Sequence, residues 1–162
     1  MKRLSIALIV YCCLTAPGLA LGPEWVGRPA PEFTLKTLDG RSAVSLSDFR
    51  GQVVVIDFWA SWCAPCKRSL PKLDVLAAGM KGVTVLAVNI DDERRNGLEF
   101  VKQHRIRLTA LHDGAKEVVA GYDVPAMPSA LVLDKKGIVR FIHAGYTDTD
   151  IEQIRKQIQE LL

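Results

Sequence analysis

A seven-residue apolar run that is followed closely by a pair of cysteines constrains this chain more than any other feature. Residues 53–59 are rich in β-branched side chains and are interrupted only by Asp57, which is typical of a strand covered on both faces. Apolar residues then recur at helical spacing, at Leu70, Leu73, Leu76, Ala77 and Met80. The sequence therefore predicts a buried strand followed directly by a helix, with Cys63 and Cys66 at their junction.

The alternation of strands and helices continues to the end of the chain. A second buried strand is expected at residues 83–90, followed by a helix entered through Asp91, Asp92 and Glu93, acids that suit a helix start. The other predicted elements are a hairpin of residues 33–38 and 43–46, a short strand at 109–111, a short helix at 115–120, a hairpin of 130–133 and 138–143, and a final helix with Thr149 and Glu152 at capping-box spacing. This order predicts an α/β fold with helices flanking a central mixed β-sheet.

The composition is that of one globular domain of nearly neutral charge. The chain has 162 residues, of which 49% are hydrophobic and 24% charged. Its 21 Lys and Arg exceed its 18 Asp and Glu, and without Lys2 and Arg3, which lie in the first 20 residues, 19 cations face 18 acids. Such a chain lacks the basic surface by which proteins bind nucleic acid, so no nucleic-acid partner is expected.

Residues 1–20 resemble a secretory signal peptide. Two cations precede an apolar run, and the segment ends at Ala20 in the small-residue pattern of a cleavage site. The sequence thus predicts an exported protein, periplasmic or otherwise. An exposed lead-in rich in Pro and Gly, at residues 21–30, would precede a single folded domain at residues 31–162.

An uncleaved membrane anchor is the alternative for the N-terminal segment. Residues 4–21 approach the roughly 18 to 20 apolar residues of a spanning helix, although Pro17 would break its last turn. A lipid on Cys12 or Cys13 is disfavoured, because neither cysteine follows the small residue that such a modification requires. Membrane attachment through the N-terminus is therefore the second interpretation.

Removal of residues 1–20 leaves two cysteines, Cys63 and Cys66. A secreted domain stabilised by a disulfide framework would have more of them at wider spacing. Two thiols three positions apart can close a disulfide, and the unpaired N–H groups at a helix start favour the thiolate of the first. The spacing indicates redox chemistry, with a structural disulfide or half of a metal site as the alternatives.

The segment from Ile56 to Lys67, IDFWASWCAPCK, resembles thioredoxin, and residues 31–162 are similar to the TlpA/ResA type of exported thioredoxin-like thiol:disulfide oxidoreductases. Trp62 precedes the first cysteine, Pro71 follows the second by five residues, and a Met-Pro pair precedes the last predicted hairpin. The resemblance implies a thioredoxin-like fold with an added N-terminal β-hairpin, and a kink in the helix at Pro71.

The resemblance also implies roles for the residues around the cysteines. Cys63 would be the exposed attacking sulfur and Cys66 the buried resolving one. Pro65 would set the redox poise of the pair, although a proline in the first turn of a helix needs no function. Trp62 would frame the surface that binds substrate, together with Trp59, for which core packing is an equally good explanation.

By the same resemblance, Pro128 would follow a cis peptide bond opposite the cysteines. That bond would hold the backbone of Met127 ready to pair with an extended strand of the substrate. From the residues alone, Pro128 would be an ordinary residue at the start of a strand. The neighbouring Pro125 is expected to be trans.

Asp57 is a carboxylate inside a buried strand, where it is costly unless it is protonated, paired or functional. The resemblance places it behind Cys66, whose proton it would accept or supply. Burial should raise its pKa toward neutrality. Thioredoxin's partner lysine falls at Ala87, so we expect Asp57 to stay protonated to a higher pH. Asp92, near the functional acid of ResA-type proteins, is a second candidate or simply a charge at a helix start.

These residues predict an enzyme that passes two electrons between the Cys63–Cys66 pair and cysteines of other proteins. The resemblance favours a reductant of selected exported proteins, such as apocytochromes c or metal-site cysteines, supplied by an upstream membrane electron donor. We expect a monomer. No nucleotide, flavin or phosphate motif is present, so no bound cofactor is expected beyond the redox-active disulfide. No metal is expected at His104, His112 and His143, which are widely separated.

Two other functions are consistent with part of this pattern. Peroxiredoxin-type thiol peroxidases share the N-terminal hairpin, but they carry Thr or Ser three residues before the reactive cysteine, where this chain has Ala60. A copper-binding module is the non-enzymatic alternative, because two thiols can hold Cu(I). Copper carriers of this fold separate their cysteines by three residues and add a distal histidine.

Overall fold

The computed structural model describes residues 21–162, and the predicted signal peptide lies outside them. The strands are β1 (Thr34–Thr37), β2 (Ala43–Ser45), β3 (Val53–Trp59), β4 (Val83–Asn89), β5 (Thr109–His112), β6 (Ser129–Leu133) and β7 (Val139–Ala144). The helices are α1 (Cys66–Ala78), α2 (Arg94–Gln103), α3 (Glu117–Gly121) and α4 (Asp150–Leu161), with the 3-10 turns η1 (Pro23–Trp25) and η2 (Leu46–Phe49). Within residues 21–162 no helix has the length and apolar character needed to span a bilayer.

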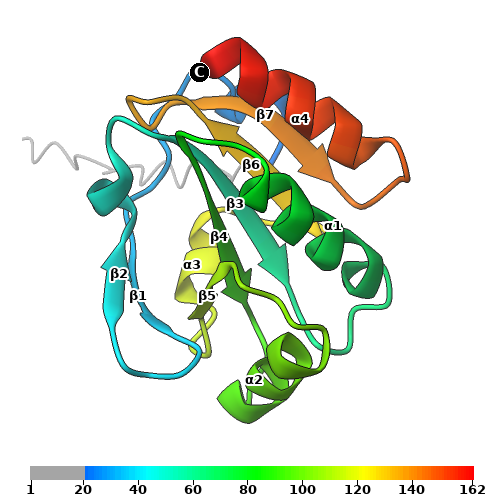
Figure 1. Cartoon of the computed structure of the whole chain (residues 1–162). Coiled ribbons are helices and arrows are strands. Elements are labelled where there is room, and N and C mark those ends of the chain that lie inside the picture. The colour runs from blue at the N-terminus through cyan, green and yellow to red at the C-terminus, as the bar shows by residue number, and fades with distance from the viewer. Residues whose placement is uncertain (1–20) are drawn as a thin grey trace, which may run out of the picture.

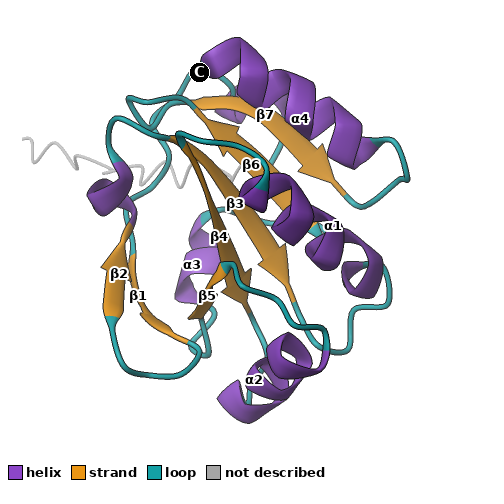
Figure 2. Cartoon of the chain, in the orientation of Figure 1, coloured by secondary structure: helices purple, strands orange, loops and turns teal. Residues whose placement is uncertain are grey.

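The strands form one seven-stranded mixed sheet in the order β2-β1-β5-β4-β3-β6-β7, with helices packed against it (Figures 1 and 2). β3 is parallel to β4 and antiparallel to β6. Because β3 and β4 run in the same direction, their carboxyl ends lie at the same edge of the sheet. The predicted α/β fold is confirmed, and the β1–β2 hairpin is the predicted N-terminal addition.

The central strand β3 is buried over its whole length, as predicted. Side chains alternate between the two faces of a strand. On one face lie Val54, Ile56 and Phe58. On the other lie Val53, Val55 and Trp59, which pack with side chains of α1, α2 and α4. Asp57 lies on this second face, between Val55 and Trp59. Its carboxyl group is therefore in the layer between the sheet and α1.

The segment at residues 21–30 differs from the exposed lead-in that its composition predicts. Leu21 and Ala30 are buried. The N–H of Gly27 donates a hydrogen bond to the carbonyl of Val139 in β7, at 2.8 Å. Because β7 is an edge strand with unpaired backbone groups, a segment that satisfies them is stabilised there.

The start of α4 also differs from the prediction. Thr149 has helical backbone angles, with φ −88° and ψ −16°, and its side chain makes no capping hydrogen bond. The carboxylate of Asp150 accepts the N–H of Thr147 instead. A capping box needs an extended N-cap residue, so the spacing of Thr149 and Glu152 does not produce one.

Candidate active site

The two cysteines form a disulfide just beyond the carboxyl end of β3, with their Cα atoms 5.2 Å apart. Helix α1 begins at Cys66 with Pro65 at its N-cap, so Cys63 lies one turn before the helix. The N–H of Cys66 donates a hydrogen bond to the Sγ of Cys63, at 3.2 Å. The first N–H groups of a helix lack intrahelical partners, and a donor of this kind stabilises negative charge on the sulfur. This geometry favours the thiolate of Cys63 once the disulfide is reduced.

Cys63 is less accessible than predicted. It is 4% exposed and Cys66 is 0% exposed, so both cysteines are buried in this oxidised state. They lie in one apolar cluster with Ala60 and Leu70, and the side chain of Met127 packs against it. The burial of Cys63 follows from the apolar side chains of this cluster, which cover the disulfide.

The two tryptophans near the disulfide have different environments. Trp62, directly before Cys63, is 67% exposed and stands in solvent. Trp59 is fully buried, with its ring centroid 4.9 Å from that of Phe100 in α2. Trp62 is therefore available to a partner, whereas Trp59 belongs to the core and does not frame the surface. Pro71 lies inside α1, as predicted.

The peptide bond between Met127 and Pro128 is cis, and Pro125 is trans, both as predicted. The N–H of Gly145 donates to the carbonyl of Pro128 at 2.8 Å, and the hydroxyl of Ser129 donates to the carbonyl of Ala126 at 2.8 Å. Within residues 21–162 the backbone of Met127 makes no hydrogen bond with another backbone group. The bonds on either side hold this loop in place and leave Met127 free to pair with a further strand.

Asp57 is buried beneath α1 in an apolar environment. Burial raises its pKa to about 8, in agreement with the predicted direction. Its register partners are Ala87 in β4 and Ala130 in β6, so neither neighbouring strand supplies a cation beside it. Within residues 21–162 its Oδ2 atom has no hydrogen-bond partner. The side chain is therefore mostly protonated at neutral pH.

Asp91 is a buried carboxylate, although its sequence position predicted only a charge at the start of a helix. It is 1% exposed, and its carboxylate accepts hydrogen bonds from the backbone N–H of Ser61 at 3.2 Å and from the Ser61 hydroxyl at 3.0 Å. It also accepts the side-chain amide of Asn89 at 2.8 Å. Because Ser61 lies two residues before Cys63, Asp91 fixes the start of the cysteine loop. Its place at the end of the strand next to β3 was the signal that could have identified it.

Asp92 occupies a different environment from its neighbour. It is exposed, and it forms a hydrogen bond and an ion pair with Lys116. The hydrogen bond from Lys116 lowers the pKa of Asp92. These contacts link Asp92 to the start of α3 and not to the cysteine loop.

Replacing Asp91 with alanine should lower the free energy of unfolding by about 3 kcal/mol, because the partly buried donors of Ser61 and the buried amide of Asn89 would lose their acceptor. The matched control is Asp92→Ala, which removes one exposed ion pair and should leave the free energy of unfolding almost unchanged. Urea unfolding of the two variants at the same pH measures both effects. Equal losses in the two variants would contradict the assignment.

Each of the three histidines contacts a different part of the protein. The Nε2 of His112 is 2.9 Å from the carbonyl of Asp91, and the Nε2 of His143 is 2.8 Å from the Oε1 of Gln157. The ring centroid of His104 lies 4.3 Å from that of Phe100. Each therefore has a structural contact. Among residues 21–162, no three His, Cys, Asp or Glu side chains are grouped as metal ligands would be.

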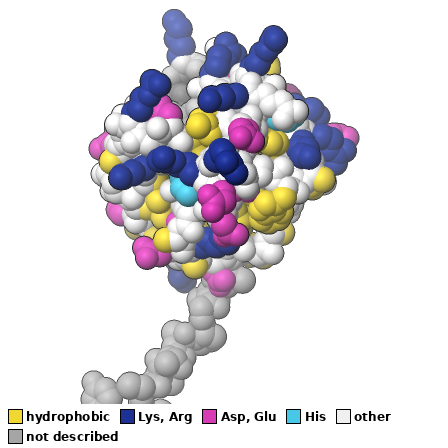
Figure 3. Space-filling model, turned by 90° about the horizontal axis from the view of Figure 1, so that it is seen from below, with side chains coloured by type: hydrophobic (Ala, Val, Ile, Leu, Met, Phe, Trp, Pro, Cys, Tyr) yellow, Lys and Arg dark blue, Asp and Glu magenta, His cyan; other side chains and the backbone are white. Residues whose placement is uncertain are grey.

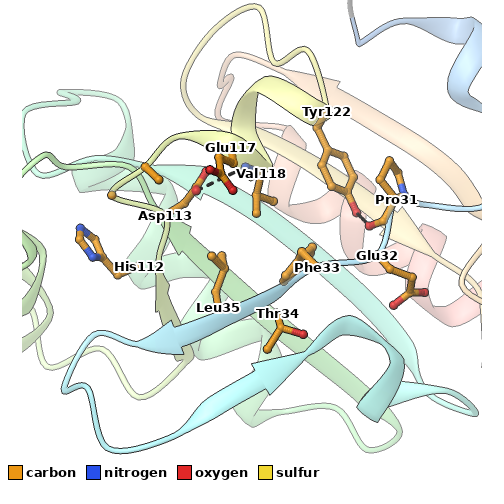
Figure 4. A pocket seen from close by; sticks show the side chains of 13 residues that line it. Pro31, Glu32, Phe33, Thr34, Leu35, His112, Asp113, Glu117, Val118 and Tyr122 are labelled. Carbon is orange, nitrogen blue, oxygen red and sulfur yellow. Dashed lines mark hydrogen bonds between the residues drawn. The ribbon is translucent and has the colours of Figure 1, made fainter.

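A cavity of about 340 Å³ lies beside α3, away from the disulfide (Figure 4). Its apolar lining comes mainly from Phe33, Leu35, Val118 and Tyr122. The hydroxyl of Tyr122 donates to the carbonyl of Pro31 at 2.7 Å. Phe33 and Tyr122 pack with the face of β3 opposite Asp57, so the cavity is not part of the cysteine site.

Residues 26–142 match the family described as AhpC/TSA. The chain belongs to the AhpC/TSA family. Two of its relatives are proteins named thiol-disulfide oxidoreductase ResA. The one from Geobacillus thermodenitrificans is 34% identical over 137 residues, which cover 83% of this chain and 78% of the relative. The one from Bacillus thuringiensis is 30% identical over 136 residues, covering 82% and 78%.

The fold of this chain is also similar to that of solved structures of thioredoxin-like proteins. A Chlorobium tepidum protein assigned as thiol:disulfide interchange protein DsbE is 36% identical, with a TM-score of 0.79 over 84% of this chain and 96% of its own. Among more distant structures, StoA from Bacillus subtilis, at 24% identity and a TM-score of 0.67, shares the fold. The chain is thus a thiol:disulfide oxidoreductase of the ResA/DsbE type with a thioredoxin-like fold, as the sequence resemblance implied.

Proposed function

We propose that this family member is an exported reductant that returns selected protein disulfides to thiols through Cys63 and Cys66. The observation that supports this most directly is the position of the disulfide, which joins Cys63, one turn before α1, to Cys66 at the start of α1. Met127 packs against the apolar cluster that contains both cysteines, and its backbone is unpaired. Export is inferred from the signal-like residues 1–20, and membrane attachment applies if that segment stays uncleaved. We further propose a membrane electron donor, a monomeric enzyme and no cofactor beyond the disulfide.

In the reaction with substrate, the Cys63 thiolate attacks a substrate disulfide, and one substrate cysteine leaves as a thiolate. The mixed disulfide joins Cys63 to a chain paired with the backbone of Met127. Cys66 then loses its proton to the Asp57 carboxylate and attacks the sulfur of Cys63. The second substrate thiolate leaves, the Cys63–Cys66 disulfide forms, and two electrons have passed to the substrate.

Asp57 acts in both directions of this cycle. With a pKa of about 8, roughly one Asp57 side chain in ten is ionised at pH 7 and can accept the proton of Cys66. When the donor reduces the disulfide, Cys66 leaves as a thiolate, and the protonated Asp57 supplies its proton. Trp62, exposed beside Cys63, contacts the partner protein, and Pro65 tunes the redox poise from its N-cap position.

A trapping experiment tests this function. In cells that express Cys66→Ala, the mixed disulfide on Cys63 cannot be resolved, so adducts to other exported proteins should accumulate and disappear on reduction. Non-reducing gels followed by mass spectrometry identify what is attached. The control is the Cys63→Ala/Cys66→Ala double variant, in which no adduct should form.

Adducts restricted to cytoplasmic proteins would contradict export, and a complete lack of adducts would contradict the reductase. Peroxide consumption by the purified protein without a protein substrate would instead favour the thiol peroxidase. Ala60 argues against that reaction, because no hydroxyl lies three residues before Cys63.

A further inference from the structure

We propose that Arg68, Lys72 and Tyr146 form a basic and aromatic rim that selects substrates with acidic side chains next to the reacting cysteine. This inference rests on the proposed function and names the chemistry of its substrates. The rim lies where α1 faces the loop after β7. Arg68 and Lys72 are one helical turn apart, whereas Tyr146 lies 78 and 74 positions after them, so only the fold brings it to them.

The three side chains form one connected cluster. The guanidinium carbon of Arg68 and the Nζ of Lys72 each lie 5.6 Å from the centroid of the Tyr146 ring. The Nζ of Lys72 also donates to the hydroxyl of Tyr146 at 2.9 Å and to the carboxylate of Asp148 at 3.3 Å. Two exposed cations thus lie beside one aromatic ring on the surface.

The cluster is joined directly to the loop that would pair with substrate. Ala144, at the end of β7, is the register partner of Ser129, which follows Pro128. The next residue, Gly145, donates its N–H to the carbonyl of Pro128 at 2.8 Å, and Tyr146 follows it. A strand paired with the backbone of Met127 therefore has this rim on one side of its path.

Exposed cations gather at the start of α1, directly after the cysteines. Lys67, Arg68 and Lys72 are exposed on the first two turns of α1, and the first turn contains no acidic residue. Asp148 pairs with Lys72, whereas Lys67 and Arg68 form no ion pair with any of residues 21–162. Figure 3 looks onto the end of the molecule toward which β3 and β4 point. Many Lys and Arg side chains project from this face, and Asp and Glu side chains lie among them near its centre. An acidic segment of a partner complements this charge.

Two peptides that differ only in charge test the rim. Each contains the same internal disulfide, flanked by three Glu in one peptide and three Lys in the other. The purified chain, reduced beforehand, is mixed with an excess of each peptide at low ionic strength, and the second-order rate constant of this single turnover is measured from the loss of the Cys63 and Cys66 thiols. We expect the Glu peptide to react about 10-fold faster, and a salt concentration near 1 M to reduce the ratio to about 2 or less.

Charge reversal identifies the residues responsible. Arg68→Glu/Lys72→Glu should bring the Glu-to-Lys ratio to 1 or below. Lys136→Glu makes a single charge reversal in the β6–β7 turn, at the end of β6 away from Pro128, and should leave the ratio near 10. The ratio is the readout because a change in Cys63 reactivity affects both peptides equally. The melting temperature of each variant verifies folding.

Each other outcome overturns the proposal in a distinct way. If the unmodified chain reduces both peptides at equal rates, the rim does not select substrates by charge. The proposed reductase function is not affected by that result. If the Glu-to-Lys rate ratio stays near 10 in Arg68→Glu/Lys72→Glu, residues outside the rim select the acidic peptide. Reduction of neither peptide overturns the proposed function together with this inference.

Discussion

Replacing Cys63 with serine should lower the rate of disulfide reduction by about 1000-fold or more. A serine hydroxyl is not ionised near neutral pH and cannot form a mixed disulfide, so both the nucleophile and the covalent intermediate are lost. Insulin-disulfide reduction with dithiothreitol as the electron source measures the effect. Substantial remaining activity in this variant would overturn the assignment of Cys63 as the attacking sulfur.

The matched variant is Cys66→Ser, which keeps the attacking cysteine and loses the resolving one. It should form one mixed disulfide per molecule and then stop. Both variants are best made with Cys12 and Cys13 replaced by alanine, because these are the other two cysteines of the chain. If Cys66→Ser turned over at the unmodified rate, resolution by Cys66 would be excluded.

Replacing Asp57 with asparagine should raise the free energy of unfolding at pH 7 by up to about 4 kcal/mol. The folded protein holds a proton on Asp57 up to a pKa of about 8, whereas the unfolded chain releases it near 3.8. Between these values the unfolded state binds fewer protons, so stability falls as pH rises. Asparagine is neutral at every pH and avoids this loss.

The pH dependence distinguishes this explanation from a general change in packing. At pH 4 the two proteins should be almost equally stable, and the advantage of Asp57→Asn should grow up to about pH 8 and then level off. Urea unfolding at pH 4, 7 and 9 measures it. A constant difference at all three pH values would contradict burial of an ionisable carboxyl as the cause.

Asp74→Asn is the control for a buried carboxylate that is already paired. Asp74 accepts the backbone N–H of Arg107 at 2.7 Å and forms an ion pair with its guanidinium at 3.3 Å. Its replacement should destabilise the protein by about 1 to 2 kcal/mol, a change of opposite sign.

Asp57→Asn should also slow the resolving step. Loss of a positioned proton acceptor typically costs about 100-fold or more in rate. The mixed disulfide on Cys63 should therefore persist in this variant, and rapid-quench experiments would detect it. Release of the substrate at the unmodified rate would mean that another group takes the proton of Cys66.

Local patterns predicted most of the elements, because each leaves a short-range signal. The apolar run of β3 and the helical spacing after Cys66 place a strand and a helix without reference to the rest of the chain. The register of Asp57 with Ala87 agrees with the expectation that no lysine lies opposite it. The cis bond before Pro128 was predicted from the family resemblance, not from the residues alone.

The incorrect predictions concern contacts between distant parts of the chain. Asp91 and Asp92 are adjacent and equally suited to a helix start, yet only Asp91 lies beneath the cysteine loop, because β4 ends beside β3. The burial of Cys63 depends on the side chains packed around it, including that of Met127. The unexpected burial of Leu21 and Ala30 goes with backbone hydrogen bonds to distant segments, from Leu21 to the carbonyl of Asp123 and from Ala30 to that of Gly137.

By itself, the sequence determined the order of the elements and the position of the two cysteines between a buried strand and a helix. Both can be predicted locally, because hydrophobic periodicity and cysteine spacing are patterns of a few neighbouring residues. Tertiary structure alone decided which groups surround those two cysteines. The loops after β3, β4 and β7 and the loop before β6 meet because the sheet order brings their strand ends together, so Asp91 reaches Ser61 and Tyr146 reaches Arg68.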